Sequence, residues 1–417
     1  MAAQRPDMKL HRSLIAAIVS GLHQVFVDGY YADRVVEVQF KEHRKWGARD
    51  RKLFARSVFE IVRWWRWFWY LAGLPDPEHA QPAAITDARL WQVWAAYHMS
   101  GGATAPDFPE CAGVDSAGLA ARRAADPGPA VRAALPDWLY ELGAAEVGPA
   151  WPALVTALNR PAEVFLRVNL LRCSTAQLQQ RLHNEGVETA TVADLPGALR
   201  LVERRPVVST AAFRAGLFEV QDAASQRIAP FLEAEPGMRV IDACAGAGGK
   251  TLHLAGLMRN KGRIIALDVH EERLTELKRR ARRHAIDIVE TRRIEGTKTI
   301  KRLAASADRV LLDVPCSGLG ILRRNPDTKW KFNPAQLAKL QALQAQVLAD
   351  YSAMVRPGGK LVYATCSVLP SENHAQVAAF LARNRATWKL EAEFTLDPAR
   401  GDYDGFYAAR LARSATG

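Results

Sequence analysis

A chain of 417 residues is long enough for more than one domain, and its hydrophobic content of 49% is sufficient to build their cores. The formal net charge of +12 favours a polyanionic partner, although many basic proteins bind none. The five cysteines form no CxxC pair, and no long apolar run marks a signal peptide or a membrane span. We therefore expect a cytoplasmic protein with free thiols and without membrane association.

Residues 9–72 are predicted to form helices, because apolar residues recur with the period of a helix. In the first helix these residues are Leu14, Ile15, Ile18, Leu22 and Val25. A second pattern, from Arg49 to Leu71, interleaves Arg with Trp. It fits either an RNA-contacting surface or a helical core with Arg on the solvent face, and we favour the core for most of the Trp residues. Better candidates for phosphate contacts are the basic residues Lys41, His43, Arg44, Lys45, Arg49, Arg51 and Lys52.

The middle of the chain predicts a connection followed by a small α+β subdomain. Residues 101–130 are rich in Gly, Ala and Pro without a sustained period, so we expect a flexible connection there. A helix is predicted from Leu135, and the pattern then changes to strand, helix, strand and strand between residues 164 and 202. The expected domains are a helical domain at 1–134, linking helices with the subdomain at 135–210, and a larger domain at 211–417.

The larger domain alternates strands with helices. The expected strands are 239–243, 263–267, 287–292, 309–314 and 360–365. This order indicates an α/β fold with a doubly wound, mainly parallel sheet.

A glycine-rich turn joins the first of these strands to a helix within Val240–Thr251. Glycines remove side chains where a ligand must approach the backbone, and the N–H groups at the helix start suit a carboxylate or phosphate. A P-loop would need its first glycine at position 244, which is Cys, so a triphosphate cradle is disfavoured. Asp268 ends the next strand, where an acidic residue can bind a ribose diol. A hydride-transfer cofactor and S-adenosylmethionine both fit these features.

Two cysteines follow later strands of the same sheet. Cys316 lies in the sequence DVPCSG after strand 309–314, and Cys366 lies in YATCS after strand 360–365. Ligands bind at this edge of doubly wound sheets. A metal pair lacks further ligands at suitable spacing, and a redox pair lacks the CxxC arrangement. Nucleophilic chemistry beside a methyl donor remains, together with the default that each is a small buried thiol.

The motifs DACAGAGGKT, DVPCSG and YATCS, in this order, resemble those of the RsmB/Sun-type RNA cytosine-C5 methyltransferases. The resemblance covers about residues 135–417 and includes Arg167-Val-Asn169, Val220-Gln-Asp222 and Asp404-Gly-Phe406. The sequence GARDRKLFARSVFEIVR resembles the NusB-like RNA-binding domain of the same family. The resemblance implies a Rossmann-like methyltransferase domain, S-adenosylmethionine as cofactor and RNA as partner. We expect a monomer.

The resemblance also implies roles for individual residues. Cys366 would attack C6 of the cytosine and Cys316 would assist breakdown of the covalent adduct. Residues at the cofactor would be Cys244, Ala245, Gly246, Ala247, Gly248, Gly249, Lys250, Asp268, Glu295 and Asp313. Four of these residues could instead have a purely structural role. Cys244 could pack in the core, Lys250 could be a solvated side chain, Asp268 could cap a helix, and Asp313 could accept hydrogen bonds from nearby backbone N–H groups. The family usually has Ala at position 246 and Pro at position 247, and Glu295 stands where it tends to have Asp.

Two basic clusters are candidates for an RNA track, with a solvated helix face as the alternative for the first. The first consists of Lys278, Arg279, Arg280, Arg282 and Arg283; the second consists of Arg323, Arg324, Lys329 and Lys331. The resemblance favours ribosomal RNA as substrate. The alternatives are a transfer-RNA cytosine-C5 methyltransferase and a catalytically idle RNA-binding assembly factor. An NAD(P)-dependent oxidoreductase would leave both strand-exit thiols without a role.

Overall fold

The computed structural model describes residues 10–78, 82–104 and 107–415, so residue 9 of the predicted helices and residues 105–106 of the predicted connection lie outside it. The chain divides into two compact units. One comprises residues 1–160 and 322–333, and the other comprises residues 161–321 and 334–417. A search of the described residues finds no helix long and apolar enough to cross a membrane.

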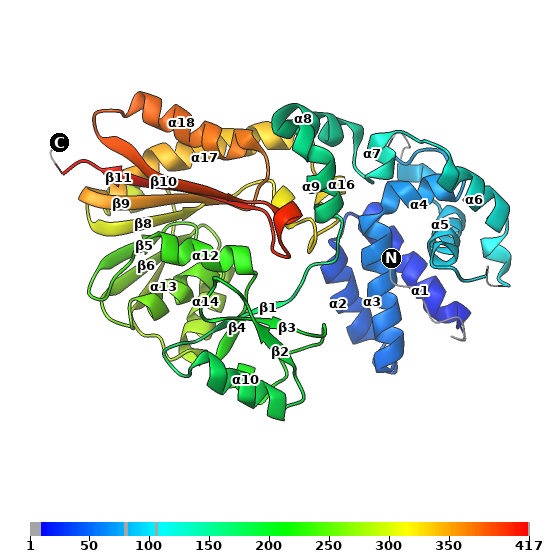
Figure 1. The fold of residues 1–417 in the computed structure, drawn as a ribbon, viewed down its shortest axis with the longest axis horizontal. Helices are drawn as coiled ribbons and strands as arrows, with labels where there is room; N and C mark the ends of the chain where they lie inside the picture. The colour runs from blue at the N-terminus through cyan, green and yellow to red at the C-terminus, as the bar shows by residue number, and fades with distance from the viewer. Residues whose placement is uncertain (1–9, 79–81, 105–106, 416–417) are drawn as a thin grey trace. The chain divides into compact units, whose positions relative to one another are not determined.

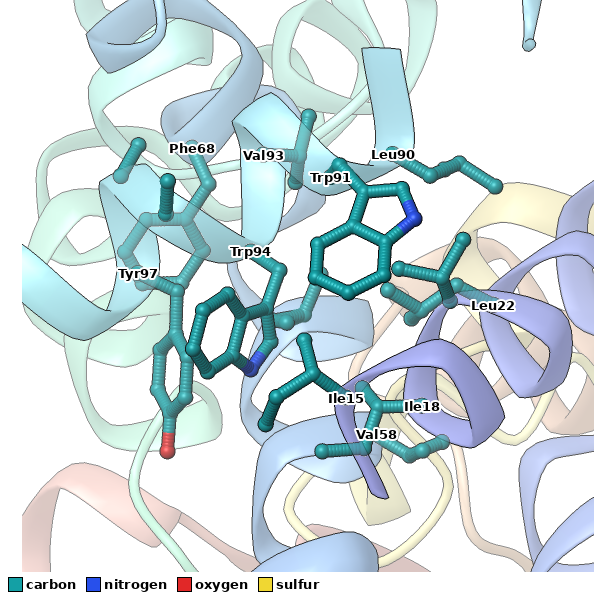
Figure 2. Packing of buried hydrophobic residues seen from close by; sticks show 14 of the residues in the cluster. Ile15, Ile18, Leu22, Val58, Phe68, Leu90, Trp91, Val93, Trp94 and Tyr97 are labelled. Atoms are coloured by element: carbon teal, nitrogen blue, oxygen red, sulfur yellow. The ribbon is translucent and has the colours of Figure 1, made fainter. Parts of the chain in front are cut away.

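The first unit is helical, as the apolar period within residues 10–72 predicts. Its helices are α1 (Arg12–Phe26), α2 (Ala32–Glu42), α3 (Ala48–Arg63), α4 (Trp65–Leu71), α5 (Asp87–Ser100), α6 (Ser116–Ala124), α7 (Pro129–Arg132), α8 (Asp137–Val147), α9 (Trp151–Leu158) and α16 (Thr328–Lys331). The five apolar residues predicted on α1 are all buried. Figure 2 shows Ile15, Ile18 and Leu22 of this face beside Trp91 and Trp94 of α5. The core therefore forms where the helical period places it.

The Trp-rich segment is part of this core. Trp65 and Trp69 are buried, and Trp64 and Trp67 pack partly buried against the same cluster. The interleaved arginines are equally structural. Arg66 is buried, and its guanidinium pairs with three carboxylates, those of Asp76, Glu78 and Asp137. The packing interpretation of the Trp residues is confirmed.

The expectation of an irregular connection at 101–130 is wrong for the segments that form α6 and α7. Asp115 caps α6 by accepting a hydrogen bond from the Gly118 N–H at 2.7 Å. Leu119 is the buried residue of this nine-residue helix, and Arg122 Nε donates to the Leu71 carbonyl. A helix with one large buried residue shows no apolar period, which is why the sequence pattern missed it.

The second unit begins with a small α+β subdomain. Its elements are β1 (Phe165–Val168), α10 (Thr175–Asn184), β2 (Thr189–Thr191), β3 (Ala198–Leu201), α11 (Ala211–Arg214) and β4 (Phe218–Val220). The strands form an antiparallel sheet of order β2-β3-β1-β4. The first three strands and α10 match the sequence pattern, whereas β4 was not predicted.

The remainder of the unit is an α/β sheet of seven strands. Its elements are α12 (Ala223–Phe231), β5 (Arg239–Asp242), α13 (Gly249–Leu257), β6 (Arg263–Asp268), α14 (Glu271–Arg283), β7 (Val289–Arg293), α15 (Thr297–Lys301), β8 (Ala307–Asp313), α17 (Pro334–Tyr351), β9 (Val355–Thr365), α18 (His374–Arg383), β10 (Trp388–Leu396) and β11 (Phe406–Arg413). The strand order is β10-β11-β9-β8-β5-β6-β7. Strands β5 to β9 are parallel, as predicted, and the β10–β11 pair adds two antiparallel strands.

Alternate residues of each central strand build a separate core on each face of this sheet. On β5, Ile241 packs with residues of α17 and α18, while Val240 packs with residues of α12, α13 and α14. Figure 1 shows the two groups of helices on opposite faces of the sheet. Both faces are thus covered, and ligands can reach the sheet only at its strand ends.

Candidate active site

The glycine-rich turn between β5 and α13 combines one crowded glycine with one open glycine. Gly248 has a φ of +85°, and a Cβ there would overlap the Leu277 side chain of α14. Gly246 has a φ of +54°, and a Cβ there would meet nothing within 4 Å. Gly248 therefore lets the turn pack closely against α14, whereas Gly246 faces open space. The turn can be approached by a ligand on the side of Gly246.

Two aspartates stand at the ends of the neighbouring strands β5 and β6. The Thr251 hydroxyl donates to Asp242 Oδ2 at 2.7 Å, while Asp242 Oδ1 is buried without a hydrogen-bond partner among the described residues. Burial raises the pKa of Asp242 to about 7. Asp268 accepts the Gly246 N–H at 2.8 Å and the His270 N–H at 2.9 Å. Asp268 is therefore not a helix cap, because the N-cap of α14 is His270 and no side chain caps that helix, and its two contacts fix the carboxylate against the glycine turn.

Lys250 and Asp313 form an ion pair across the strand ends. Lys250 Nζ lies 2.5 Å from Asp313 Oδ2, and it also lies 5.3 Å from the centre of the Phe406 ring. Burial lowers the pKa of Lys250, but the charge of Asp313 and its hydrogen bond raise this pKa by more, so the net shift is upward. Lys250 therefore stays protonated and is not an ordinary solvated side chain.

The two strand-exit cysteines lie together. Strands β8 and β9 are parallel neighbours with Asp313 opposite Ala364, so both chains leave the sheet at the same edge. Cys316 Sγ and Cys366 Sγ are 3.3 Å apart. The hydrogen bond to Cys366 is the largest cause, and burial the next, of a pKa of the Cys316 thiol that lies well above its ordinary value. A protonated Cys316 is thus placed to donate a hydrogen bond to the Cys366 sulfur.

A buried carboxylate joins the two cysteine loops. Glu372, in the short helix η6 (Pro370–Glu372), accepts from the backbone N–H of Ser317 at 2.8 Å and from its hydroxyl at 2.5 Å. It also accepts from the Ser367 hydroxyl at 2.5 Å. Sequence reasoning missed these three residues. The available signal was that each of the two cysteines is followed by Ser.

Backbone contacts lock the same loops to the segment before β11. The Gly320 N–H donates to the Cys366 carbonyl, and the Gly405 N–H donates to the Gly320 carbonyl, each at 2.8 Å. A Cβ on Gly320 would overlap both the Gly405 and the Cys366 carbonyl groups. At Gly405, in the sequence Asp404-Gly-Phe406, a Cβ would overlap the Val368 side chain and stand 3.0 Å from Gly320 Cα, so this position also favours glycine.

Residues of the α+β subdomain support the glycine turn from outside. Arg167 is buried and donates at 2.5 Å to Gln221 Oε1 and to the Gly249 carbonyl. Asn169 Nδ2 donates to the carbonyls of Gly216 and His284. The motifs Arg167-Val-Asn169 and Val220-Gln-Asp222 therefore connect the subdomain to the start of α13 and the end of α14.

Other predicted site residues are placed less centrally. Ala245 is buried in the core beneath the turn, and the Ala247 carbonyl accepts from Arg280 at 2.6 Å. Cys244 is half-buried, and burial raises its pKa well above the ordinary value. It is therefore a poor thiolate, as the packing interpretation implies. Glu295 is exposed two residues after β7, and its role at the cofactor remains a prediction.

The second basic cluster is not an RNA track, because most of it belongs to the core of the helical unit. Lys329 is fully buried and donates to the Arg63 carbonyl and to Asn159 Oδ1. Arg323 is buried, and Arg63 donates to its carbonyl at 3.0 Å. Lys331 bonds the carbonyls of Gly29 and Tyr30. The prediction of an RNA track is therefore corrected for Arg323, Lys329 and Lys331, and for the half-buried Arg324 it stays a prediction.

The first basic cluster divides into structural and exposed members. Arg280 and Arg283 both pair with the buried carboxylate of Glu219, which also bonds His284 Nε2 at 2.7 Å. Lys278, Arg279 and Arg282 are exposed on α14. Arg280 and Arg283 are therefore unsuited to phosphate contacts. For the three exposed residues, both an RNA track and a solvated helix face stay open.

Comparisons with known proteins agree with this arrangement. The family model "16S rRNA methyltransferase RsmB/F" matches residues 229–412, and a ferredoxin-like domain model of RsmF/B-like methyltransferases matches residues 135–208. A probable ribosomal RNA small subunit methyltransferase B of Synechocystis sp. is 36% identical over 300 residues, which is 67% of either chain. The Klebsiella pneumoniae ribosomal RNA small subunit methyltransferase B is 36% identical over 66% of this chain and 65% of its own length. The alignments thus span about two thirds of these relatives.

Solved structures share the fold. The crystal structure of PH0851 matches 97% of this chain and 99% of its own with a TM-score of 0.78 at 24% identity. A methyltransferase homologue of Pyrococcus horikoshii matches 69% of this chain and 97% of its own with a TM-score of 0.60 at 27% identity. The first of these likenesses extends over both units and concerns the fold alone.

Proposed function

Since the chain belongs to the RsmB/F family of 16S rRNA methyltransferases, which depend on S-adenosylmethionine, we propose that it methylates C5 of a cytosine in small-subunit ribosomal RNA. The observation that carries the proposal is the pair of thiols 3.3 Å apart at the exits of β8 and β9, beside the Lys250–Asp313 pair. Cytosine C5 is too electron-poor to take a methyl group directly, and a nucleophile that adds at C6 overcomes this.

The residues at the strand ends fit the methyl donor. The open side of the turn at Gly246 gives access to backbone N–H groups, and Asp268 is held beside it. Asp242 Oδ1 is a buried acceptor to which none of the described residues donates. These are the groups that a ribose diol and an amino-acid moiety would use. Bound there, S-adenosylmethionine would supply an electrophilic methyl group. Residues 244–250 and Asp268 would hold it, and Asp313 would lie towards the base.

The two thiols have distinct parts in the proposed reaction. Cys366 as thiolate adds to C6, which places an electron pair on C5; C5 takes the methyl group, and the donor leaves as a neutral thioether. C5 then loses its proton to solvent, the electron pair of that C–H bond restores the C5–C6 double bond, and the electron pair of the broken C6–S bond returns to the Cys366 sulfur. Cys316, which keeps its proton beside Cys366 in the free enzyme, assists this last step.

The substrate assignment is tested by bisulfite sequencing of ribosomal and transfer RNA from cells with and without the gene. We expect one cytosine of the small-subunit RNA to lose its C5 methyl group. Loss of methylation in a transfer RNA alone would transfer the proposal to that substrate, and unchanged methylation of both would contradict it. The control is the same cells carrying the Cys366→Ala variant. It distinguishes the effect of losing the protein from the effect of losing its methyl-transfer activity alone.

Asp268→Ala is expected to weaken S-adenosylmethionine binding by about 1–3 kcal/mol, because hydrogen bonds to the ribose and the anchoring of the turn are lost together. Titration calorimetry measures the change. Asp308→Ala is a matched control, since Asp308 also accepts a backbone N–H, that of Arg239, but stands near the opposite end of β8. Equal affinities for Asp268→Ala and the native protein would remove Asp268 from the site.

The logarithm of the RNA association constant is expected to fall linearly with the logarithm of the salt concentration. Replacing Arg44, Lys45 and Arg49 by Gln should make this slope less steep. These three side chains are exposed around the connection from α2 to α3. Each lost phosphate contact should reduce the slope by ~0.7–0.9. The double variant Arg385→Gln/Lys389→Gln removes exposed charge near β10 and serves as the control. A slope that stays the same in the triple variant would show that this surface does not follow the phosphate backbone.

A further inference from the structure

Glu372 lies at a point where both cysteine loops can be held at once. Its side chain is fully buried, and it bonds the residue that directly follows each cysteine, Ser317 and Ser367. The two hydroxyl oxygens are themselves 3.2 Å apart. One carboxylate thus spans two loops that are 50 residues apart in sequence and that carry the two thiols.

The hydrogen-bond donors around the Glu372 side chain require an acceptor group there. The Leu319 N–H donates to Ser317 Oγ and the Leu369 N–H donates to Ser367 Oγ, so both hydroxyl protons are free to point at Glu372 Oε2. At Oε1 the donors are the Ser317 N–H and the Gln344 amide. Four donors therefore converge on two oxygens, which an ionised carboxylate satisfies and an amide does not.

The carboxylate is itself fixed from two further elements. Gln344 of α17 is fully buried, and its amide donates both to Glu372 Oε1 at 2.9 Å and to the carbonyl of Pro315 at 3.0 Å. The Tyr363 hydroxyl of β9 donates to the Glu372 carbonyl at 2.7 Å. Cys316 is consequently held on both sides, by Pro315 before it and by Ser317 after it.

We propose that Glu372 is a positioning residue that sets the separation of the Cys316 and Cys366 thiols by binding Ser317 and Ser367. The effect of Glu372 on turnover rests on the proposed function, whereas its effect on the distance between the two thiols does not depend on that function. Because reacting groups misplaced by about 1 Å can lose about 10²-fold in rate, a loosened carboxylate should reduce kcat far more than substrate affinity.

The test uses the full-length protein without RNA or donor and reacts it with dibromobimane, a short reagent that links two neighbouring thiols. Mass spectrometry identifies the linked Cys316–Cys366 peptides and the singly modified ones. We expect the ratio of linked to singly modified product to fall at least ~5-fold in Glu372→Gln, which keeps the side-chain volume and changes the acceptor. Ser352→Ala is the control, because it removes a buried hydroxyl of the same unit that bonds the Ala349 carbonyl.

The single variants Ser317→Ala and Ser367→Ala keep the test decisive if Glu372→Gln does not fold, because each removes a hydroxyl bond to the carboxylate. Both should also lower the linking ratio. In methylation assays, Glu372→Gln should lower kcat by about 10²-fold while KM for RNA changes little. A native linking ratio in all folded variants would overturn the proposal. A lower ratio in a protein whose native form shows no cytosine methylation would instead leave the positioning role standing and reject the proposed function.

Discussion

Cys366→Ala is expected to abolish methyl transfer, with a loss of roughly 10⁴-fold or more, the scale seen when a covalent nucleophile is removed. The Cys316 thiol lies 3.3 Å from this sulfur and can donate a hydrogen bond to it, and alanine supplies neither the nucleophile nor its bond to C6. Transfer of a tritiated methyl group from S-adenosylmethionine to RNA measures the effect.

Cys173→Ala is the matched control for this substitution. Cys173 is another free thiol of the second unit, but it is buried in the core of the α+β subdomain, where its Sγ lies 3.8 Å from the Leu217 carbonyl oxygen. Its variant should keep native activity. Methyl transfer at the native rate in folded Cys366→Ala would mean that Cys366 is not the nucleophile, and the same result in Cys316→Ala as well would exclude covalent catalysis through these thiols.

Glu219→Ala is expected to lower the free energy of unfolding of the second unit by about 3–5 kcal/mol, because Arg280, Arg283 and His284 lose the buried carboxylate that compensates them. Denaturant unfolding measures it. Glu290, which is only partly buried and pairs with Arg263 and Arg292, supplies the matched control. Glu290→Ala should cost no more than about 1 kcal/mol. A similar cost for both variants would contradict the structural role assigned to Glu219.

The same carboxylate should make stability depend on pH. Burial raises the pKa of Glu219, but hydrogen bonds from His284 and Arg280 lower it more, so the net shift is strongly downward. A carboxyl group with a lowered folded pKa stabilises the protein fully above its unfolded pKa of about 4.3. That contribution is lost as the pH falls below this value, so the stability difference between native protein and Glu219→Ala should shrink in acid.

Much of the second unit was predictable from sequence because its strands are short apolar runs that end at recognisable motifs. Val240 and Ile241 are buried on opposite faces, which gives the continuous apolar pattern of a strand covered on both sides. The placement of Cys316 and Cys366 at one edge followed from parallel strands alone. Strands β10 and β11 were missed, since their antiparallel partners are set by tertiary pairing and not by a local pattern.

Contacts between distant segments could not be predicted. Lys329 lies 13 residues after Cys316, and its charge suggested solvent or RNA, yet it is buried against Arg63 and Asn159. Glu372 likewise showed no pattern that marked it as the partner of two serines. Both outcomes depend on which buried groups meet in the folded chain, and a local pattern does not contain that information.

The most direct test of the covalent mechanism is a denaturing gel of Cys316→Ala after incubation with labelled substrate RNA and S-adenosylmethionine. With Cys366 present to attack and Cys316 absent to assist release, we predict a protein–RNA species that persists under denaturing conditions. The species should vanish when Cys366→Ala is added to the same chain. A persistent complex in Cys366→Ala with none in Cys316→Ala would contradict the account, because it would make Cys316 the nucleophile.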